Sequence, residues 1–293
     1  MSRARRRIVA VRLTARASVL LATTSLLGLA AFGWPLLVHE RSGANLAHSA
    51  DAPWIFVALL PLLIAIVLGE IAEGSLDAKA VALLGILAAC GSALRVPSPG
   101  VAGLEPMFFL LICSGRVLGR GFGFVLGALT LFASALITGG VGPWLPFQML
   151  GAAWLGFGAA CLPRARGKAE IAILAAYAVV ASLLYGALEN LWFWPFGAGT
   201  TTTFSYLPGG GVLENLHRFV LFDLTTSLGF DIPRAVTNVV LILVLGRPVL
   251  GALRRASRRA VFEPVVVLHD AASTPGVGDA AGTVPGRTGS PVP

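Results

Sequence analysis

The sequence predicts an all-α polytopic membrane protein with about eight transmembrane helices, two at the N-terminus and six in a following core. The chain of 293 residues is 56% hydrophobic and only 12% charged, and its mean hydropathy is +0.82. A soluble domain typically carries about 25% charged residues. The apolar residues gather in runs of roughly 17–25 residues, the length that crosses a bilayer. Most Lys and Arg residues lie in alternate links between these runs, as they do in cytoplasmic loops.

The expected spans follow one another along the chain. The first covers residues 17–38 and comes after MSRARRRIVAVRLTAR. Its apolar run of about 22 residues exceeds a signal-peptide core of roughly 7–15, so we expect a retained helix. The remaining spans are expected at residues 53–69, 78–94, 105–118, 122–137, 143–162, 171–194 and 232–245.

Composition divides the chain into three regions. Residues 1–76 hold the basic N-terminus and the two extra helices, and residues 77–260 hold the six-helix core. Residues 261–293 are rich in Pro, Gly and Ala and lack an apolar period, which predicts a disordered cytoplasmic tail.

The charges of the links predict the orientation. The link GRVLGR carries Arg116 and Arg120, whereas the link TGGVGPW carries no charge. Because Lys and Arg mark cytoplasmic loops, we expect a multi-pass protein of the cell membrane with both termini in the cytoplasm. The net charge of +8 follows from these flanking residues, so we predict no nucleic-acid partner.

Polar and aromatic side chains recur at the outer ends of several expected spans, which predicts a pocket for a small organic ligand. Gln148 is the strongest single candidate. For the aromatic residues an interfacial belt is the alternative, and Asp231 and Arg234, three apart, are also spaced as a local helix pair. Glu105, before Pro106, is also placed as a helix start. The candidate set is Glu105, Trp144, Phe147, Gln148, Glu189, Asn190, Trp192, Asp231, Arg234 and Asn238.

The sequence does not favour an enzyme. The segment GRGFG lacks the GK[ST] of a phosphate-binding loop, and GxSxG and HExxH are absent. Cys90, Cys113 and Cys161 lie in apolar segments without a CxxC spacing, so we expect small buried thiols. No metal or other cofactor is predicted.

Small residues recur four apart in the span at residues 78–94, at Gly85, Ala89 and Ala93. Rows of this kind let helix backbones approach closely in lipid. The row is consistent with packing inside the molecule and with docking of another membrane subunit.

Residues from about Ala78 to Arg259 resemble the substrate-specific S component of energy-coupling factor (ECF) vitamin transporters, nearest the cobalamin-type subgroup. The segments that carry the resemblance are KAVALLGILAACGSALR, LEPMFFLLICSGRVLG and, most specifically, GGVGPWLPFQM. The resemblance implies a subunit that captures a vitamin or a related micronutrient from outside and topples in the membrane to release it. It also implies that the Gly85, Ala89 and Ala93 row contacts a transmembrane T subunit, and that two cytoplasmic ATPases supply the energy. The loops RVPSPGVAG and PFGAGTTTTFSYLPGGG would be lids, and the first two spans and the tail depart from the family's six-helix plan.

Two other functions remain as alternatives. A stand-alone transporter or channel would want charged pathway residues near the middle of the membrane. A membrane enzyme acting on lipid or prenyl substrates would want a metal-binding acidic cluster, for which Glu70, Glu73 and Asp77 are the nearest candidates. These three lie beside Lys79, which favours a solvated connector.

Overall fold

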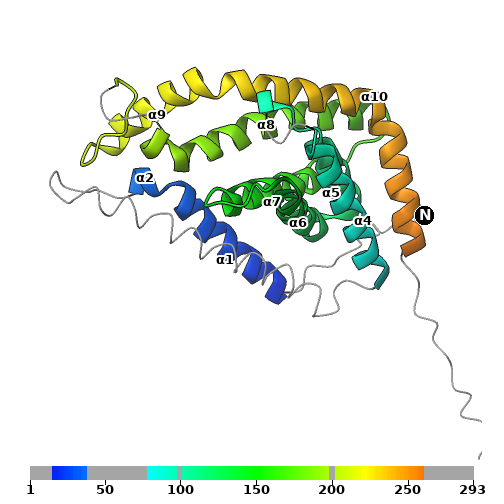
Figure 1. The fold of residues 1–293 in the computed structure, drawn as a ribbon. Helices are drawn as coiled ribbons and strands as arrows, with labels where there is room; N and C mark the ends of the chain where they lie inside the picture. Colours follow the sequence, from blue (N-terminus) through cyan, green and yellow to red (C-terminus); the bar gives the residue numbers. More distant parts are fainter. Residues whose placement is uncertain (1–14, 38–77, 98–100, 198–201, 261–293) are drawn as a thin grey trace, which may run out of the picture. The chain divides into compact units, whose positions relative to one another are not determined.

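The computed structural model describes residues 15–37, 78–97, 101–197 and 202–260. These residues form helices joined by short links, without a strand in the described ranges (Figure 1). The elements are α1 (Ala15–Phe32), α2 (Trp34–Leu37), α4 (Ala78–Arg95), the short 3-10 helix η2 (Val101–Gly103), α5 (Met107–Leu118), α6 (Arg120–Thr138), α7 (Leu145–Cys161), α8 (Lys168–Gly197), α9 (Val212–Thr226) and α10 (Leu228–Ala260).

Three of these helices are long and apolar enough to cross a membrane, within Arg120–Thr138, Lys168–Phe196 and Leu228–Arg258. Shorter apolar helices cover Ser18–Phe32, Met107–Leu118 and Leu145–Cys161. The chain is therefore a membrane protein, and its described residues are all-helical. The expected span at residues 53–69, the acidic triplet at Glu70, Glu73 and Asp77 and the C-terminal tail lie outside the described residues.

Most helix bounds agree with the expected spans, and two differ for physical reasons. The first span is divided at Gly33, where α1 gives way to the short α2. The last span is the middle of α10, a helix of 33 residues that continues through the basic stretch after residue 245. The helix continues because Leu250 and Leu253, three residues apart, are buried against the main hydrophobic core.

Helices α5, α6 and α7 pack closely at a crossing made of glycines (Figure 1). A Cβ atom on Gly115 would lie 2.0 Å from the carbonyl oxygen of Gly156, and one on Gly123 would lie 2.4 Å from the same oxygen. No larger side chain fits between these backbones. The crossing therefore fixes α5, the helix whose N-terminal end holds Glu105, against α6 and α7.

The N-terminal helix α1 packs on this core. The Phe32 ring meets Phe147 of α7 edge to face with centroids 4.9 Å apart, and the Trp154 indole donates a hydrogen bond to the Ser25 hydroxyl. Thus at least the first of the two extra N-terminal segments is part of the packed molecule.

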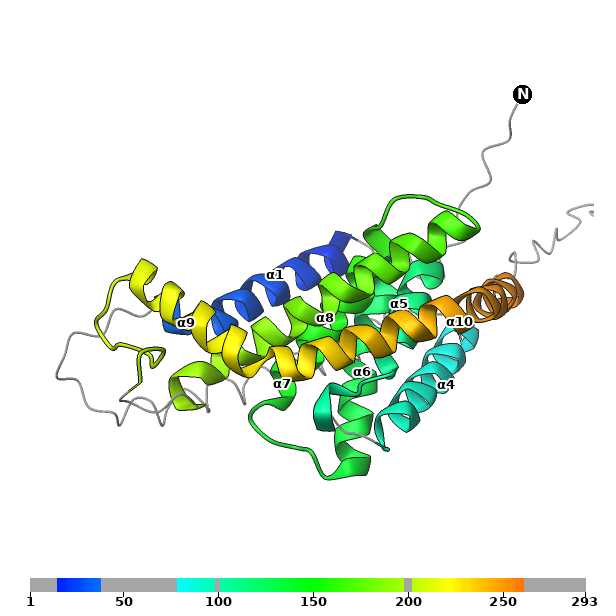
Figure 2. The same ribbon diagram turned by 90° about the horizontal axis from the view of Figure 1, so that it is seen from above.

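Helices α8 and α10 lie side by side, as both ribbon views show (Figure 2). Arg116, at the end of α5, donates to a Glu170 carboxyl oxygen at 3.1 Å and to the carbonyl oxygens of Leu162 and Pro163. Arg254 of α10 binds both oxygens of the same carboxylate. Arg116 is therefore a buried link between helices, beyond the orientation signal expected from the sequence.

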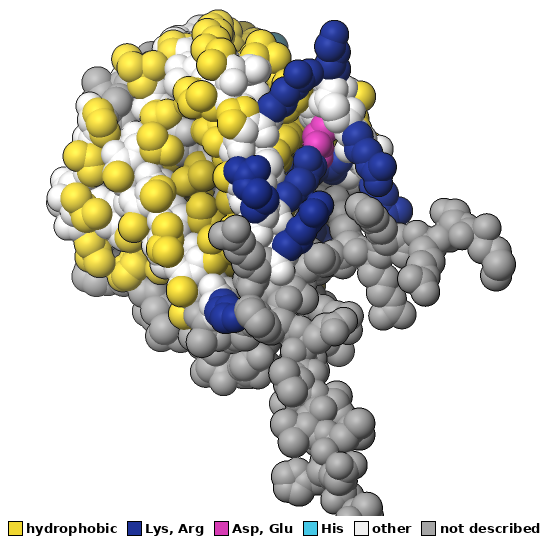
Figure 3. All heavy atoms as spheres, turned by 90° about the vertical axis from the view of Figure 1, so that its right-hand side faces the viewer, with side chains coloured by type: hydrophobic (Ala, Val, Ile, Leu, Met, Phe, Trp, Pro, Cys, Tyr) yellow, Lys and Arg dark blue, Asp and Glu magenta, His cyan; other side chains and the backbone are white. Residues whose placement is uncertain are grey.

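Basic side chains gather around an acidic one at one side of the molecule, next to a largely hydrophobic surface (Figure 3). The described exposed cations that precede or begin α8, or lie near the end of α10, are Arg164, Arg166, Lys168, Arg247, Arg254, Arg255 and Arg258. The sequence analysis predicts that these residues lie in cytoplasmic links.

The small-residue row of α4 faces outward. Gly85, Ala89 and Ala93 are exposed, and nothing described lies within 4 Å of a Cβ placed on Gly85. Ala88 and Ser92, which are also four residues apart, are buried, and the Ser92 hydroxyl donates to the Thr130 carbonyl of α6. Internal packing of α4 therefore uses Ala88 and Ser92, while the Gly85, Ala89 and Ala93 row is left uncovered by the described residues.

The expectation of three buried thiols was wrong in part. All three cysteines are free, but only Cys113 is buried, at the core-facing side of α5. Cys90 and Cys161 are exposed because they lie on the outer sides of α4 and α7.

Candidate functional site

Charged side chains from three separate segments meet at the start of α5. The Arg234 guanidinium of α10 donates through Nε to Glu105 Oε2 at 2.6 Å and through Nη1 to Asp231 Oδ1. The Arg95 Nε, at the end of α4, lies 3.7 Å from the other Glu105 oxygen. All four residues are at most 7% exposed. Such a buried network is tolerated only because each charge has a partner of opposite sign.

Asn238 fixes the start of α5 against α10. Its side-chain oxygen accepts a hydrogen bond of 2.6 Å from the Phe109 backbone N–H, one of the first-turn donors that lack a partner inside a helix. Its amide group donates to the carbonyl oxygens of Glu105 and Arg234. Asn238 therefore holds the backbone of Glu105 next to the backbone of Arg234.

The junction of α9 and α10 holds Asp231. The Ser227 hydroxyl donates to Asp231 Oδ2 at 2.6 Å, and Arg234 binds the other oxygen. A Cβ on Gly186 of α8 would lie 2.0 Å from Asp231 Oδ1, so only glycine at this position lets the carboxylate reach α8. Gly186 and Ser227 together place Asp231 at the wall of a cavity.

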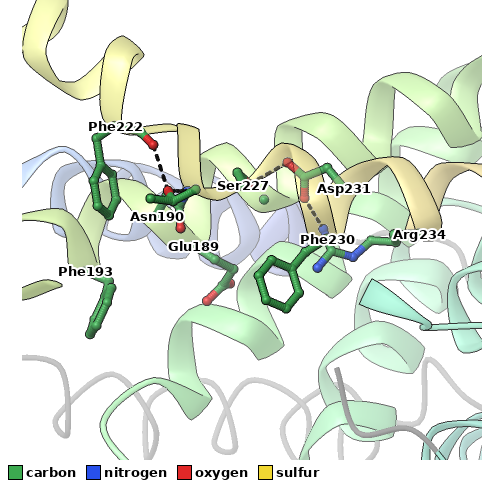
Figure 4. Close-up of a pocket in the computed structure, with 10 residues that line it drawn as sticks. Glu189, Asn190, Phe193, Phe222, Ser227, Phe230, Asp231 and Arg234 are labelled. Atoms are coloured by element: carbon green, nitrogen blue, oxygen red, sulfur yellow. Dashed lines mark hydrogen bonds and ion pairs between the residues drawn. The ribbon is translucent and has the colours of Figure 1, made fainter. Parts of the chain in front are cut away.

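That cavity is a pocket of about 330 Å³ between the end of α8 and the α9–α10 junction (Figure 4). This volume is at the lower end of the range for small-molecule sites, roughly 300–1,000 Å³. Its wall combines phenyl rings with carboxyl, amide and hydroxyl groups. The lining residues are Gly186, Glu189, Asn190, Phe193, Phe222, Thr226, Ser227, Phe230, Asp231 and Arg234.

Glu189 is a lining residue whose carboxyl group has an oxygen atom without a hydrogen bond among the described residues. Its Oε2 accepts a hydrogen bond of 3.4 Å from the Trp192 indole, whereas its buried Oε1 has no hydrogen-bond partner among the described residues. Tyr185, one turn earlier on α8, is 4% exposed, and its hydroxyl likewise lacks a described partner. Both side chains lie against Gly151 of α7, where a Cβ would be 2.9 Å from Tyr185 Cε2 and 3.5 Å from Glu189 Oε1.

Helix α9 is held over the end of α8 by polar and aromatic contacts. The Asn190 amide donates to Asp223 Oδ1 at 2.9 Å and to the Thr226 hydroxyl. Burial raises the pKa of the Asp223 carboxyl above its ordinary value, against the lowering effect of the hydrogen bond from Asn190. Trp194 packs with Phe219 and Phe222 in a small cluster separate from the main core. The wall that α9 contributes is therefore attached to α8 by a limited set of contacts.

The structure brings together most of the residues predicted from the sequence. Glu189, Asn190, Asp231 and Arg234 line the pocket, and Glu105 and Asn238 lie directly behind Arg234. Asp231 and Arg234 do form the local pair that their spacing indicated, and Arg234 additionally reaches Glu105.

The remaining predicted residues lie toward α7. The Phe147 ring stacks on Trp192 with centroids 4.7 Å apart, and Trp192 binds Glu189. Trp144 is 42% exposed and donates to the Gly140 carbonyl, as an interfacial residue would. Gln148, the strongest sequence candidate, is half-buried one turn after Trp144 and does not line the pocket.

Sequence reasoning missed four kinds of residue at this site. Arg95 comes directly after the expected span at residues 78–94 and is not in the candidate set, and Phe222 and Phe230 had no distinguishing pattern among the chain's 16 phenylalanines. Ser227 follows two threonines in a polar TTS segment, which could have indicated the α9–α10 junction. Gly186 carried no signal, because its role depends on a carboxylate 45 positions away.

Among the described residues, no group of three or more His, Cys, Asp or Glu side chains could hold a metal ion. Comparison with protein-family models, with proteins of curated function and with solved structures gave no match to this chain.

Proposed function

We propose that the chain is a membrane-embedded capture subunit and that it acts as an ECF S component. It would bind a vitamin or a related organic micronutrient. The observation that carries the proposal is the pocket at the α8–α10 end, where phenyl rings and hydrogen-bonding groups surround about 330 Å³. A lining of this kind suits an organic molecule better than an inorganic ion. A cavity of about 330 Å³ is too small for a whole corrinoid, so the smaller vitamins and their precursors are the first ligands to test.

The buried ion network supports binding at a preformed site. Arg234 is held by Glu105 and Asp231, and Asn238 ties the same helix to α5. Side chains fixed in this way lose little conformational entropy when a ligand binds. The wall made by α9 rests on fewer contacts, and we assign to it the movement that admits the ligand.

The exposed row on α4 supports a partner within the membrane. Gly85, Ala89 and Ala93 present a face without bulky side chains, and small residues allow close helix contact in lipid. In this proposal the row docks on a T subunit, and two cytoplasmic ATPases supply the energy. Eight spans with both termini in the cytoplasm complete the arrangement.

The experiment tests the docking row and the energy source together. Tagged chain is purified in mild detergent from its native cells, and copurifying proteins are identified by mass spectrometry. We expect a second integral membrane protein and two ABC-type ATPases with the wild-type chain, and their loss with Gly85→Leu and Ala89→Leu. Both positions are exposed, so the variants should fold.

Ala172→Leu is the matched control, since Ala172 is an exposed small residue on a different helix, α8. It should keep the partners. Retention of the ATPases by Gly85→Leu and Ala89→Leu would remove the docking assignment. Absence of any ATPase from the wild-type preparation would contradict the proposed function itself.

A further inference from the structure

The pocket carries more acidic than basic groups. Its lining includes the carboxyl groups of Glu189 and Asp231 and one guanidinium group, that of Arg234. The positive charge of Arg234 is already balanced, because it pairs with both Glu105 and Asp231. Glu189 is the acidic group of this set without a guanidinium partner among the described residues.

Glu189 also stands among aromatic rings. In the close-up its carboxyl group lies between the rings of Phe193 and Phe230, and Phe222 closes the α9 side of the same pocket (Figure 4). Phenyl faces attract cations through their quadrupole, and a carboxylate binds a charged N–H donor about twice as strongly as a neutral one. The phenyl rings and the Glu189 carboxylate therefore both favour a cationic ligand group with N–H donors.

The unused hydrogen-bonding capacity of Glu189 is that of an acceptor, which suits a cationic N–H donor. Glu189 Oε1 is a buried acceptor without a hydrogen-bond partner among the described residues. An ammonium group has three N–H donors and no acceptor, so it would supply the donor that the Glu189 carboxylate lacks. A ligand carboxylate would instead meet Glu189 with a like charge.

We propose that this pocket binds the ammonium group of an organic amine, with Glu189 as its principal partner and the phenyl rings around its carbon skeleton. This inference rests on the proposed function in taking the pocket as the binding site, and it adds the chemical class of the ligand. The amine can come from a free metabolite or from the headgroup of an aminophospholipid.

The test compares three probes of one shape on the purified full-length chain by isothermal titration: 2-phenylethylammonium, neutral 2-phenylethanol and anionic 3-phenylpropanoate. We expect the ammonium probe to bind at least about tenfold more tightly than the other two, the size of one charge-assisted contact. Equal binding of the three probes, preference for the anion, or no binding of the ammonium probe would overturn the proposal.

Two variants assign the preference to Glu189. Glu189→Gln keeps the size of the side chain and should bring the three probes to within about twofold of one another. Glu214→Gln removes an exposed acid on α9 that does not line the pocket, and it should leave the preference unchanged. Survival of the preference in Glu189→Gln would also overturn the assignment.

A last comparison separates the two sources of the amine. In nanodiscs that contain phosphatidylethanolamine, a headgroup site would show weaker probe binding than in phosphatidylcholine nanodiscs, through competition. Both lipids are zwitterionic, but only phosphatidylethanolamine has an ammonium group with N–H donors. A site for a free amine would bind the probe equally in both. Because these titrations use the isolated chain, their failure is distinct from a failure to copurify ATPases.

Discussion

Glu105 is the residue on which the polar end of the molecule depends. One carboxyl oxygen lies 2.6 Å from Arg234 and the other 3.7 Å from Arg95, so a single side chain joins the guanidinium groups of α10 and α4. Glu105 is 2% exposed, and water cannot replace it as a partner. Its removal would leave buried positive charge uncompensated, which costs far more than the pair itself contributes.

Glu105→Gln should therefore lower the free energy of unfolding by about 3–5 kcal/mol, the cost of breaking a buried ion pair. Equilibrium unfolding in detergent, followed by circular dichroism, measures it. Glu214→Gln is the control, because its pair with Arg218 is exposed on α9 and should contribute less than about 1 kcal/mol. Equal effects of the two substitutions would refute the role given to Glu105.

At the scale of single residues, the sequence could indicate which polar residues lie near the site, but it could predict only some of the contacts between them. The i,i+3 spacing of Asp231 and Arg234 predicted their contact, because neighbours on one helix face need no tertiary information. The contact between Glu105 and Arg234 joins positions 129 apart, so the sequence could not predict it. Gln148 and Trp144 are residue types that often line binding sites, but they do not line this pocket. Which polar residues meet depends on how the helices pack.

The packing of helices depends on glycine backbones at the α5–α6–α7 crossing. Gly115, Gly119, Gly123 and Gly127 recur four apart in the sequence, a signal that could have located this crossing. The Gly85 row of α4 has the same four-residue spacing, but it is exposed. Small-residue spacing predicts that a close contact exists, but it does not say whether the partner is inside the molecule or outside.

Gly156→Ala should destabilise the protein, because the new Cβ would lie 2.2 Å from the Gly123 carbonyl oxygen. Overpacking of this kind costs about 1–3 kcal/mol. Gly85→Ala should instead be neutral or stabilising by roughly 0.5–1 kcal/mol, since the added methyl group enters open space within a helix. Thermal melts of both variants test the contrast, and a stable Gly156→Ala protein would contradict the crossing.

Helix positions were the most predictable feature of the elements. Runs of apolar residues located α4 to α8 to within a few residues, because the length of a span is set by hydrophobic composition. The break at Gly33 and the extension of α10 beyond residue 245 were not predicted. The extension of α10 depends on the packing of Leu250 and Leu253, which composition does not encode, whereas the break at Gly33 lies beside Pro35, a residue that interrupts helices.

For the molecule as a whole, the two ends of α7 define its orientation. The chain before α7 is uncharged and includes the exposed Val141, whereas exposed Cys161 ends the helix and precedes Arg164 and Arg166. Basic residues mark the cytoplasmic side. The Val141 end should therefore face outward and the Cys161 end inward.

Labelling with a membrane-impermeant maleimide measures this orientation. With Cys90 and Cys113 replaced by Ala, Cys161 should react in inverted vesicles and stay unlabelled in intact cells. Val141→Cys in a cysteine-free chain should show the reverse. Reaction of both positions from the same side would contradict the assigned crossing of α7.

The most direct measurement of the central claim is to identify what the protein carries. The chain is purified in detergent and denatured, and the released small molecules are identified and quantified by mass spectrometry and absorption. A capture subunit predicts one organic molecule at close to one per chain, with its amount reduced in Glu189→Gln. An empty preparation that also binds none of a panel of vitamins and related amines would contradict the account.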